Sequence, residues 1–270
     1  MESATPVTKL GLGGHSFIRE LGNDPPAAFE EQCALVAACL DTGIRWIDTT
    51  YYQERVALGR VLGQLSRARG EARLTAWNFF REPGRENSLP GFTAYDQDSL
   101  PKQLAELRTD FLDLLVIHTR DDSAALHREI ELASAWQAAG LVREVGLGMA
   151  RLEDLDCLPT GHPITQVLAP YNAFHPHAAA LFREAKARGM ATVAMSPFVR
   201  GWNLDKIGGD RRVSAAILLR WVTSQEIVDT VFVSMRRAEW VLANRESEKR
   251  GPLSNEETAL VREWTARLEG

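Results

Sequence analysis

The chain has 270 residues, of which 45% are hydrophobic and 25% charged, and its formal net charge is -5 at pH 7. This is the composition of a globular protein with a large core, and the modest negative charge excludes the basic footprint of nucleic-acid binding or a patch for anionic membranes. No apolar run reaches the length of a bilayer span, residues 1–8 lack the pattern of a signal peptide, and Cys33, Cys39 and Cys157 lack metal spacing, so we expect a cytoplasmic protein.

Short apolar runs alternate with helical patterns along the chain. The first run, 10–14, is rich in glycine but fits neither the spaced dinucleotide fingerprint nor the P-loop, which favours close backbone packing in a barrel. Apolar residues at helical spacing predict a helix over 27–42, Gly43 suits its C-cap, and a buried strand over 44–47 ends at Asp48.

The rest of the chain repeats this alternation. We predict strands over 73–78, 112–117, 143–147, 165–169, 191–195 and 230–233, and helices over 54–67, 99–108, 123–139, 177–188, 213–223, from 238 onwards and over 255–268. Eight strands alternating with helices, without a linker or a change in composition, predict a TIM (β/α)8 barrel that forms a single domain over 1–270. A doubly wound open sheet is the alternative, but it would need a phosphate-binding glycine turn after one strand, which we do not find.

Residues at the carboxyl ends of the strands are the candidates for chemistry, because a TIM barrel places its site there. Asp48 is followed by two tyrosines, Tyr51 and Tyr52, and the strand before His118 is wholly apolar. Each has a structural alternative: Asp48 as a helix cap and His118 as a core histidine. The long loop over 80–98, rich in glycine and proline, is a further candidate for the site.

Several ordered segments together resemble the aldo-keto reductases. The segment 43–50 resembles the strand that carries the family's aspartate, and 108–118 is similar to the strand that ends in its active-site histidine. The later matching segments are 142–147, Tyr171 with Asn172, 196–198 with Gly201, and Ser234, Met235 and Arg236 followed by Glu239 and Asn244. The resemblance covers nearly the full length of the chain.

The resemblance implies reduction of a small carbonyl compound with NADPH, or the reverse oxidation of an alcohol. In the family a tyrosine donates the proton, assisted by a lysine, an aspartate and a histidine, which implies catalytic roles for Asp48, Tyr52 and His118. The implied cofactor residues are Gln166, Tyr171, Ser196, Phe198, Ser234, Met235, Arg236, Glu239 and Asn244, and the implied substrate residues are Tyr51, Trp77 and Phe80. Within this set, Arg236 is expected to pair with the 2'-phosphate of NADPH, and no metal is expected.

This chain departs from the family pattern in three places. Tyr52 follows Asp48 by four residues, one fewer than the common spacing, so Tyr51 competes for the role of acid. The family's lysine should fall at Ala76 or Trp77, and its Ser-Asn pair for the nicotinamide carboxamide should fall at 148–149, which here is Gly-Met. Two alternatives to carbonyl reduction therefore remain: a non-redox lyase, isomerase or cyclase that uses Asp48, Tyr52 and His118 as acid and base, or a cofactor-binding protein without turnover.

Overall fold

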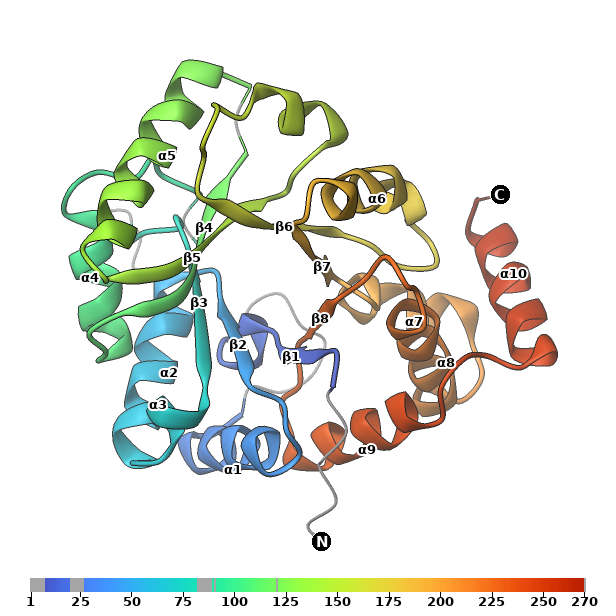
Figure 1. The fold of residues 1–270 in the computed structure, drawn as a ribbon. Helices are drawn as coiled ribbons and strands as arrows, with labels where there is room; N and C mark the ends of the chain where they lie inside the picture. The colour runs from blue at the N-terminus through green and yellow to red at the C-terminus, as the bar shows by residue number, and fades with distance from the viewer. Residues whose placement is uncertain (1–7, 20–26, 82–88, 90, 120, 270) are drawn as a thin grey trace, which may run out of the picture.

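Eight parallel strands close into a barrel, and helices surround it (Figure 1). The structure is a computed structural model, and it describes residues 8–19, 27–81, 89, 91–119 and 121–269. Each strand pairs with its neighbour in the chain, and β1 pairs with β8 to close the circle, which confirms the predicted TIM barrel.

The strands are β1 (Leu10–Leu12), β2 (Trp46–Thr49), β3 (Arg73–Trp77), β4 (Leu112–His118), β5 (Val142–Gly148), β6 (Ile164–Pro170), β7 (Ala191–Met195) and β8 (Thr230–Val233). The helices are α1 (Phe29–Asp41), α2 (Tyr52–Gln64), α3 (Ala68–Glu71), α4 (Ser99–Leu107), α5 (Ser123–Ala138), α6 (Ala179–Ala187), α7 (Trp202–Ile207), α8 (Arg211–Thr223), α9 (Ala238–Lys249) and α10 (Asn255–Glu269). Short 3-10 turns occupy Gly14–Ser16, Leu152–Cys157, Pro176–Ala178 and Val199–Gly201.

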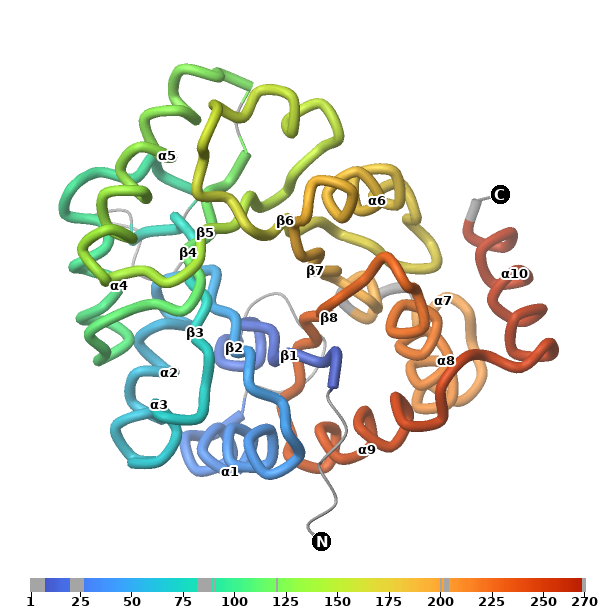
Figure 2. Tube along the Cα trace, in the orientation of Figure 1, coloured from blue at the N-terminus to red at the C-terminus, as the bar shows by residue number. Residues whose placement is uncertain are grey.

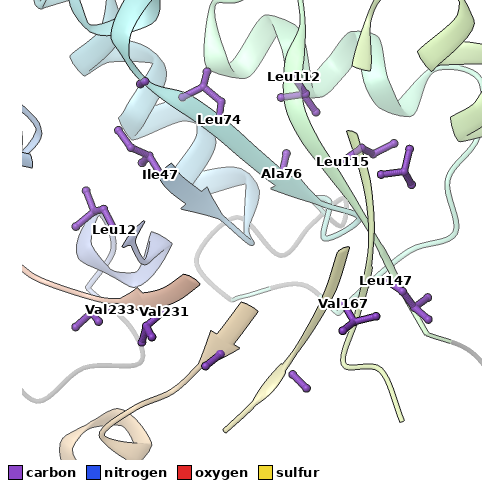
Figure 3. Packing of buried hydrophobic residues seen from close by; sticks show 14 of the residues in the cluster. Leu12, Ile47, Leu74, Ala76, Leu112, Leu115, Leu147, Val167, Val231 and Val233 are labelled. Atoms are coloured by element: carbon purple, nitrogen blue, oxygen red, sulfur yellow. The ribbon is translucent and has the colours of Figure 1, made fainter. Parts of the chain in front are cut away.

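Alternate residues of each strand face the helices and the barrel axis, because successive side chains of a strand point to opposite faces. The helix-facing layer is apolar and fully buried, and Figure 3 shows part of it, including Ile47, Leu74 and Ala76. Trp77 and Phe232 belong instead to a separate cluster inside the barrel. Ala76 and Trp77 therefore lie on opposite faces of β3, which decides which of the two can reach a residue at the barrel mouth.

The structure differs from the prediction mainly in short helices. The helix predicted over 54–67 begins two residues earlier, at Tyr52, and a separate turn, α3, follows it. The six-residue α7 was not predicted, and glycines with positive φ, Gly201 and Gly208, lie at its two ends. Residues 82–88 and 90 of the expected site loop lie outside the described residues.

The last helix, α10, packs at the edge of the molecule beside α7 and α8 (Figure 2). Its Val261 and Trp264 join a second apolar cluster with Leu204, Ile217 and other residues of α7 and α8. Through this cluster the C-terminal helix supports the two helices that border the barrel mouth beyond β7. No helix within the described ranges is long and apolar enough to cross a membrane.

Candidate active site

Asp48 lies inside the barrel near the end of β2 and is only 5% exposed. Its Oδ1 accepts a hydrogen bond of 2.9 Å from Trp77 Nε1. Burial, followed by the nearby carboxylate of Glu54, raises the pKa of Asp48 to about 7, although the bond from Trp77 acts in the opposite direction. A carboxyl with this pKa exchanges its proton near neutral pH, which suits acid–base chemistry.

The Trp77 indole spans the barrel interior from Asp48 to β5. A Cβ built on Gly148 would overlap the indole at Cζ3 and would lie 2.6 Å from Val116 Cγ1. Position 148 therefore has to be glycine while position 77 is tryptophan. The ring occupies the space in front of Gly148.

A buried arginine fixes the loops above these strands. Arg55 in α2 is fully buried, and its Nε pairs with Glu106 Oε2 at 2.6 Å. Its remaining nitrogens donate to three backbone carbonyls at the strand ends, those of Thr50, Trp77 and Phe79, at 3.1, 3.2 and 2.7 Å. This guanidinium thus ties the end of β2 to the end of β3 and holds the mouth of the barrel in place.

Two further polar residues meet beside Asp48. His15, in the turn after β1, places Nδ1 2.7 Å from Oε1 of Glu54, which is fully buried at the start of α2. The other carboxylate oxygen of Glu54 accepts from the backbone N–H groups of Thr50 and Tyr51, at 2.6 and 3.1 Å. The turn after β1 is therefore linked directly to the loop that follows Asp48.

Five rings form a row across this part of the mouth, which we call the aromatic row: His15, Tyr51, Phe79, Phe92 and His118. His15 stacks on Tyr51, and Tyr51 meets the edge of Phe79. Phe79 contacts both Phe92 and His118, and Phe92 stacks flat on His118 with 4.5 Å between the ring centroids. The row thus reaches from β1 to the end of β4.

The structure separates the predicted substrate residues Tyr51 and Phe80 and the predicted acid Tyr52. Tyr51 belongs to the aromatic row, whereas Tyr52 is the first residue of α2, and its ring faces the guanidinium of Arg81. Phe80 packs against Tyr95 and Arg55, away from the row, and its neighbour Phe79 takes the place at the mouth. Of the two tyrosines, Tyr51 is the one that the structure brings beside His15.

A cavity of about 730 Å³ opens at the same mouth. It runs from the ends of β1, β2, β7 and β8, where Asp48, Thr50 and His15 line it, to the facing sides of α8 and α9. Seven of the predicted cofactor residues line it: Ser196, Phe198, Ser234, Met235, Arg236, Glu239 and Asn244. Its volume is within the range of ordinary ligand sites.

The remaining two predicted cofactor residues lie elsewhere. Gln166 is the third residue of β6, far from the carboxyl end, and its amide donates to Glu144 of β5. Tyr171 is buried between the rings of Phe182 and Trp221, on the helix side of the barrel. Neither residue lines the cavity, because one is at the wrong end of its strand and the other points into the core.

The lining of the cavity fits a phosphorylated dinucleotide. Arg211, Arg212 and Arg236 provide positive charge, and Ser234 and Asn244 provide a hydroxyl and an amide for hydrogen bonds. Arg236 is 4% exposed, and its Nη2 donates to the Ile18 carbonyl at 2.9 Å, so the turn after β1 holds this guanidinium in the cavity wall. Within the described part of the chain no group of three or more His, Cys, Asp or Glu side chains could hold a metal ion.

His118 lines a different hollow. Its Nδ1 lies 2.8 Å from the carbonyl of Thr119, and the imidazole faces a space of about 520 Å³ bordered by Phe92, Met149 and Arg151. The structure therefore brings Asp48 and the cofactor-type residues to one cavity, whereas His118 lies at the far end of the aromatic row and lines the second hollow.

Sequence reasoning missed His15, Glu54 and Arg55. His15 could have been identified from the sequence, because it follows the first predicted strand and the site was expected at strand ends. Glu54 and Arg55 gave no comparable signal, since charged residues at the start of a helix are usually solvated. Their burial depends on contacts with residues 39 and 51 positions away, His15 and Glu106.

A sequence model described as "Aldo/keto reductase family" matches residues 9–216. Among curated proteins, the chain is 22% identical over 187 residues to "Aldo-keto reductase YhdN" of Bacillus subtilis (strain 168). It is 26% identical over 117 residues to "Methylglyoxal reductase DkgB" of Salmonella typhi. These matches cover 64% and 42% of this chain but 53% and 41% of those proteins, so the chain spans about half the length of the curated relatives it matches.

Solved structures of low sequence identity share the fold. The aldo-keto reductase AKR11C1 from Bacillus halodurans, in its holo form, superposes with a TM-score of 0.77 at 18% identity, covering 96% of this chain and 92% of that one. An aldo/keto reductase from Klebsiella pneumoniae in complex with NADP and acetate gives a TM-score of 0.74 at 20% identity, with the same coverage. The glycerol dehydrogenase AKR11B4 from Gluconobacter oxydans gives 0.77 at 17%, covering 99% and 93%.

Proposed function

The chain belongs to the aldo/keto reductase family, and from this premise we propose that it is an NADPH-dependent oxidoreductase that reduces a small carbonyl compound or oxidises the corresponding alcohol. The observation that carries the proposal is the cavity that joins Asp48 to α8 and α9. Relatives support it as well: one is named a methylglyoxal reductase, and a solved structure of the same fold holds NADP.

Seven residues would hold the dinucleotide: Ser196, Phe198, Ser234, Met235, Arg236, Glu239 and Asn244. When bound, NADPH supplies a hydride to the carbonyl carbon. The arginines of the cavity wall, Arg211, Arg212 and Arg236, would balance the charge of the phosphates. Phe232 and Met195 of the cavity lining would give a small carbonyl compound an apolar surface.

The departure from the family's lysine is part of this proposal. We infer that the Trp77 indole stands where the lysine is expected, because its Nε1 donates to Asp48 and Ala76 faces the helices. An indole N–H orients the carboxyl but brings no positive charge, so the pKa of Asp48 stays high instead of being lowered by an ammonium. The carboxyl is consequently available as a proton-exchanging group near pH 7.

The test is titration with NADPH, followed by turnover. We expect NADPH to bind with a change in its fluorescence and to be oxidised in the presence of small aldehydes or ketones. The same assays with NADH give the cofactor preference. Absence of NADPH binding would contradict the proposal, whereas binding without turnover of any carbonyl compound would indicate a cofactor-binding protein.

A second function is favoured by one observation, the pKa of about 7 at Asp48 without a nearby lysine. A carboxyl of this kind, beside His15 and Tyr51, could carry out isomerisation or elimination without a redox cofactor. Conversion of a hydroxycarbonyl compound in the absence of NADPH, followed by NMR, would identify this activity.

A further inference from the structure

We propose that His15, oriented by Glu54, donates and accepts the proton at the substrate oxygen in this cavity. The inference rests on the proposed function and assigns the proton step to residues outside the set that the family resemblance implies. It follows from the position of His15, the environment of Glu54 and the separation of His118 from the cavity.

Glu54 is built to hold an imidazole in one orientation. Its side chain is fully buried, and one carboxylate oxygen is fixed by the backbone N–H groups of Thr50 and Tyr51. The other oxygen is directed at His15 Nδ1, at 2.7 Å. Gly14 allows this approach, because a Cβ there would overlap Glu54 Oε2. In the described structure, the only charged partner of this buried carboxylate is one histidine. Proteins orient a general base by this arrangement.

This contact decides which nitrogen of His15 is available. Because Nδ1 faces a carboxylate, it carries the hydrogen, and Nε2 is the nitrogen left to exchange a proton. His15 lines the cavity and its side chain is 24% exposed, so the imidazole is accessible. In the described ranges, Nε2 has no hydrogen-bond partner within the protein.

His118 is placed less well for the same task. Its Nδ1 contacts the Thr119 carbonyl, and Phe92 covers the face of its ring. It borders the smaller hollow and is absent from the lining of the large cavity. Of these two imidazoles, His15 is the one that lines the cavity with Asp48.

The proton balance of the step is simple. In reduction, the carbonyl carbon gains a hydride with both electrons, the π pair of the carbonyl moves to the oxygen, and the Nε2–H of protonated His15 supplies the proton of the new hydroxyl. The imidazole is left neutral and keeps the hydrogen on Nδ1 toward Glu54. In alcohol oxidation, neutral His15 removes the hydroxyl proton at Nε2.

Three charged groups face His15: Glu54 from α2, Asp48 from β2, and Arg236, whose Nη2 lies 3.4 Å from the His15 carbonyl. Tyr51 covers one face of the ring. Carbonyl reduction takes a proton from His15 and alcohol oxidation gives one to it, so the two directions should have opposite pH dependence.

The experiment compares His15→Gln with His118→Asn and with His177→Gln, a control at an exposed position on the 3-10 turn before α6. We expect kcat for carbonyl reduction to fall by about 10²–10⁴-fold in His15→Gln, the usual contribution of a general acid, with NADPH affinity unchanged. His118→Asn should lose less than His15→Gln, and His177→Gln should match the wild type. Glu54→Gln removes the carboxylate that orients His15, so kcat for carbonyl reduction should fall while KM and the NADPH affinity stay unchanged.

The tautomer of His15 can be measured without any turnover of substrate, and it tests the same proposal. In ¹⁵N NMR spectra, neutral His15 should show a protonated Nδ1, and His15→Gln assigns the signal. The Nε2–H form, or a His15→Gln variant that binds NADPH and retains wild-type kcat, would overturn the role of His15 and leave the proposed function intact. Failure of the wild type to bind NADPH would overturn both.

Discussion

At the scale of single residues, the buried carboxyl of Asp48 determines the acid–base chemistry at the barrel mouth. Asp48 has a pKa of about 7 because the barrel interior solvates its charge poorly and Glu54 is nearby. The hydrogen bond from Trp77 compensates only in part. Burial of this carboxyl therefore lowers the free energy of unfolding near neutral pH, which an aspartate on the surface would not do.

Replacement of Asp48 by Asn should remove a pH dependence of stability. The folded state keeps a proton on Asp48 up to about pH 7, whereas the unfolded chain releases it near 3.9, so the folded state binds more protons between these values. The free energy of unfolding should therefore fall as the pH rises through this window, by up to about 4 kcal/mol. Urea unfolding at pH 5, 6, 7 and 8 measures the free energy of unfolding at each pH. The prediction would be contradicted if this free energy changed with pH equally in the wild type and in Asp48→Asn.

Arg236→Ala should weaken NADPH binding more than NADH binding. The guanidinium lines the cavity beside the start of α9 and is the charge expected to pair with the 2'-phosphate. Because its Nη2 also donates to the Ile18 carbonyl, the variant should lose some stability as well, so melting curves must accompany the titrations. Arg211→Ala, from the same cavity but more exposed, is the matched control. Equal losses for both cofactors would show that Arg236 does not read the phosphate.

At the scale of elements, the indole of Trp77 in β3 packs directly against Gly148 in β5. Trp77 leaves no room for a side chain at position 148, so the identities of these two residues depend on each other. Position 148 is one of the two positions at which the family resemblance led us to expect a side chain that binds an amide, and Trp77 leaves no room for one there.

Gly148→Ala should destabilise the protein by about 1–3 kcal/mol, the usual cost of overpacking a core. The cost should be smaller in a Trp77→Leu background, where the indole no longer meets the new methyl group. Gly70→Ala, in α3 with no atom within 4 Å of the added Cβ, should be close to neutral. A double-mutant cycle from denaturation curves gives the coupling between positions 77 and 148, and additive effects would refute it.

The elements themselves could largely be predicted from the sequence, because each strand is a short apolar run and each long helix has an apolar face. The order of strands and helices then led to the barrel. The short α7 was missed because six residues between two glycines carry too little periodicity. The face of Trp77 was also undetermined, since moving a strand by one residue exchanges its two faces.

The site was predictable only in part for the same reason. Residues next to strand ends, such as Asp48, and a local motif such as Ser234–Arg236 were found because they are close in sequence to recognisable elements. The pairing of His15 with Glu54 was not found, because only the folded barrel brings these two segments together. The place of Gln166 outside the cavity lining could not be predicted, because a residue within a predicted strand does not reveal its depth along the barrel axis.

At the scale of the whole molecule, the cavity is assembled from both ends of the chain. The turn after β1 supplies His15, and α8 and α9 supply the opposite wall. The helices α4 and α5 lie across the barrel from α8 and α9 (Figure 1). Closure of β1 against β8 is what brings these walls together. Ligand binding should therefore stabilise the region of closure most strongly.

NADPH at 100 times its dissociation constant should stabilise the protein by about 2.7 kcal/mol against unfolding. Hydrogen exchange should slow in the turn after β1, in α8 and in α9, because these segments form the walls of the cavity. The helices α4 and α5 serve as an internal reference and should change only with global stability. Protection confined to α4 and α5 would place the cofactor elsewhere.

The bond between Trp77 and Asp48 also makes the barrel optically readable. The indole is a chromophore whose N–H is held 2.9 Å from a carboxyl that changes charge near neutral pH, so its electronic transitions experience that charge directly. Difference absorption or emission spectra between wild type and Trp77→Phe would isolate this one ring among seven tryptophans. A pH titration of that signal would follow a single buried proton without any added probe.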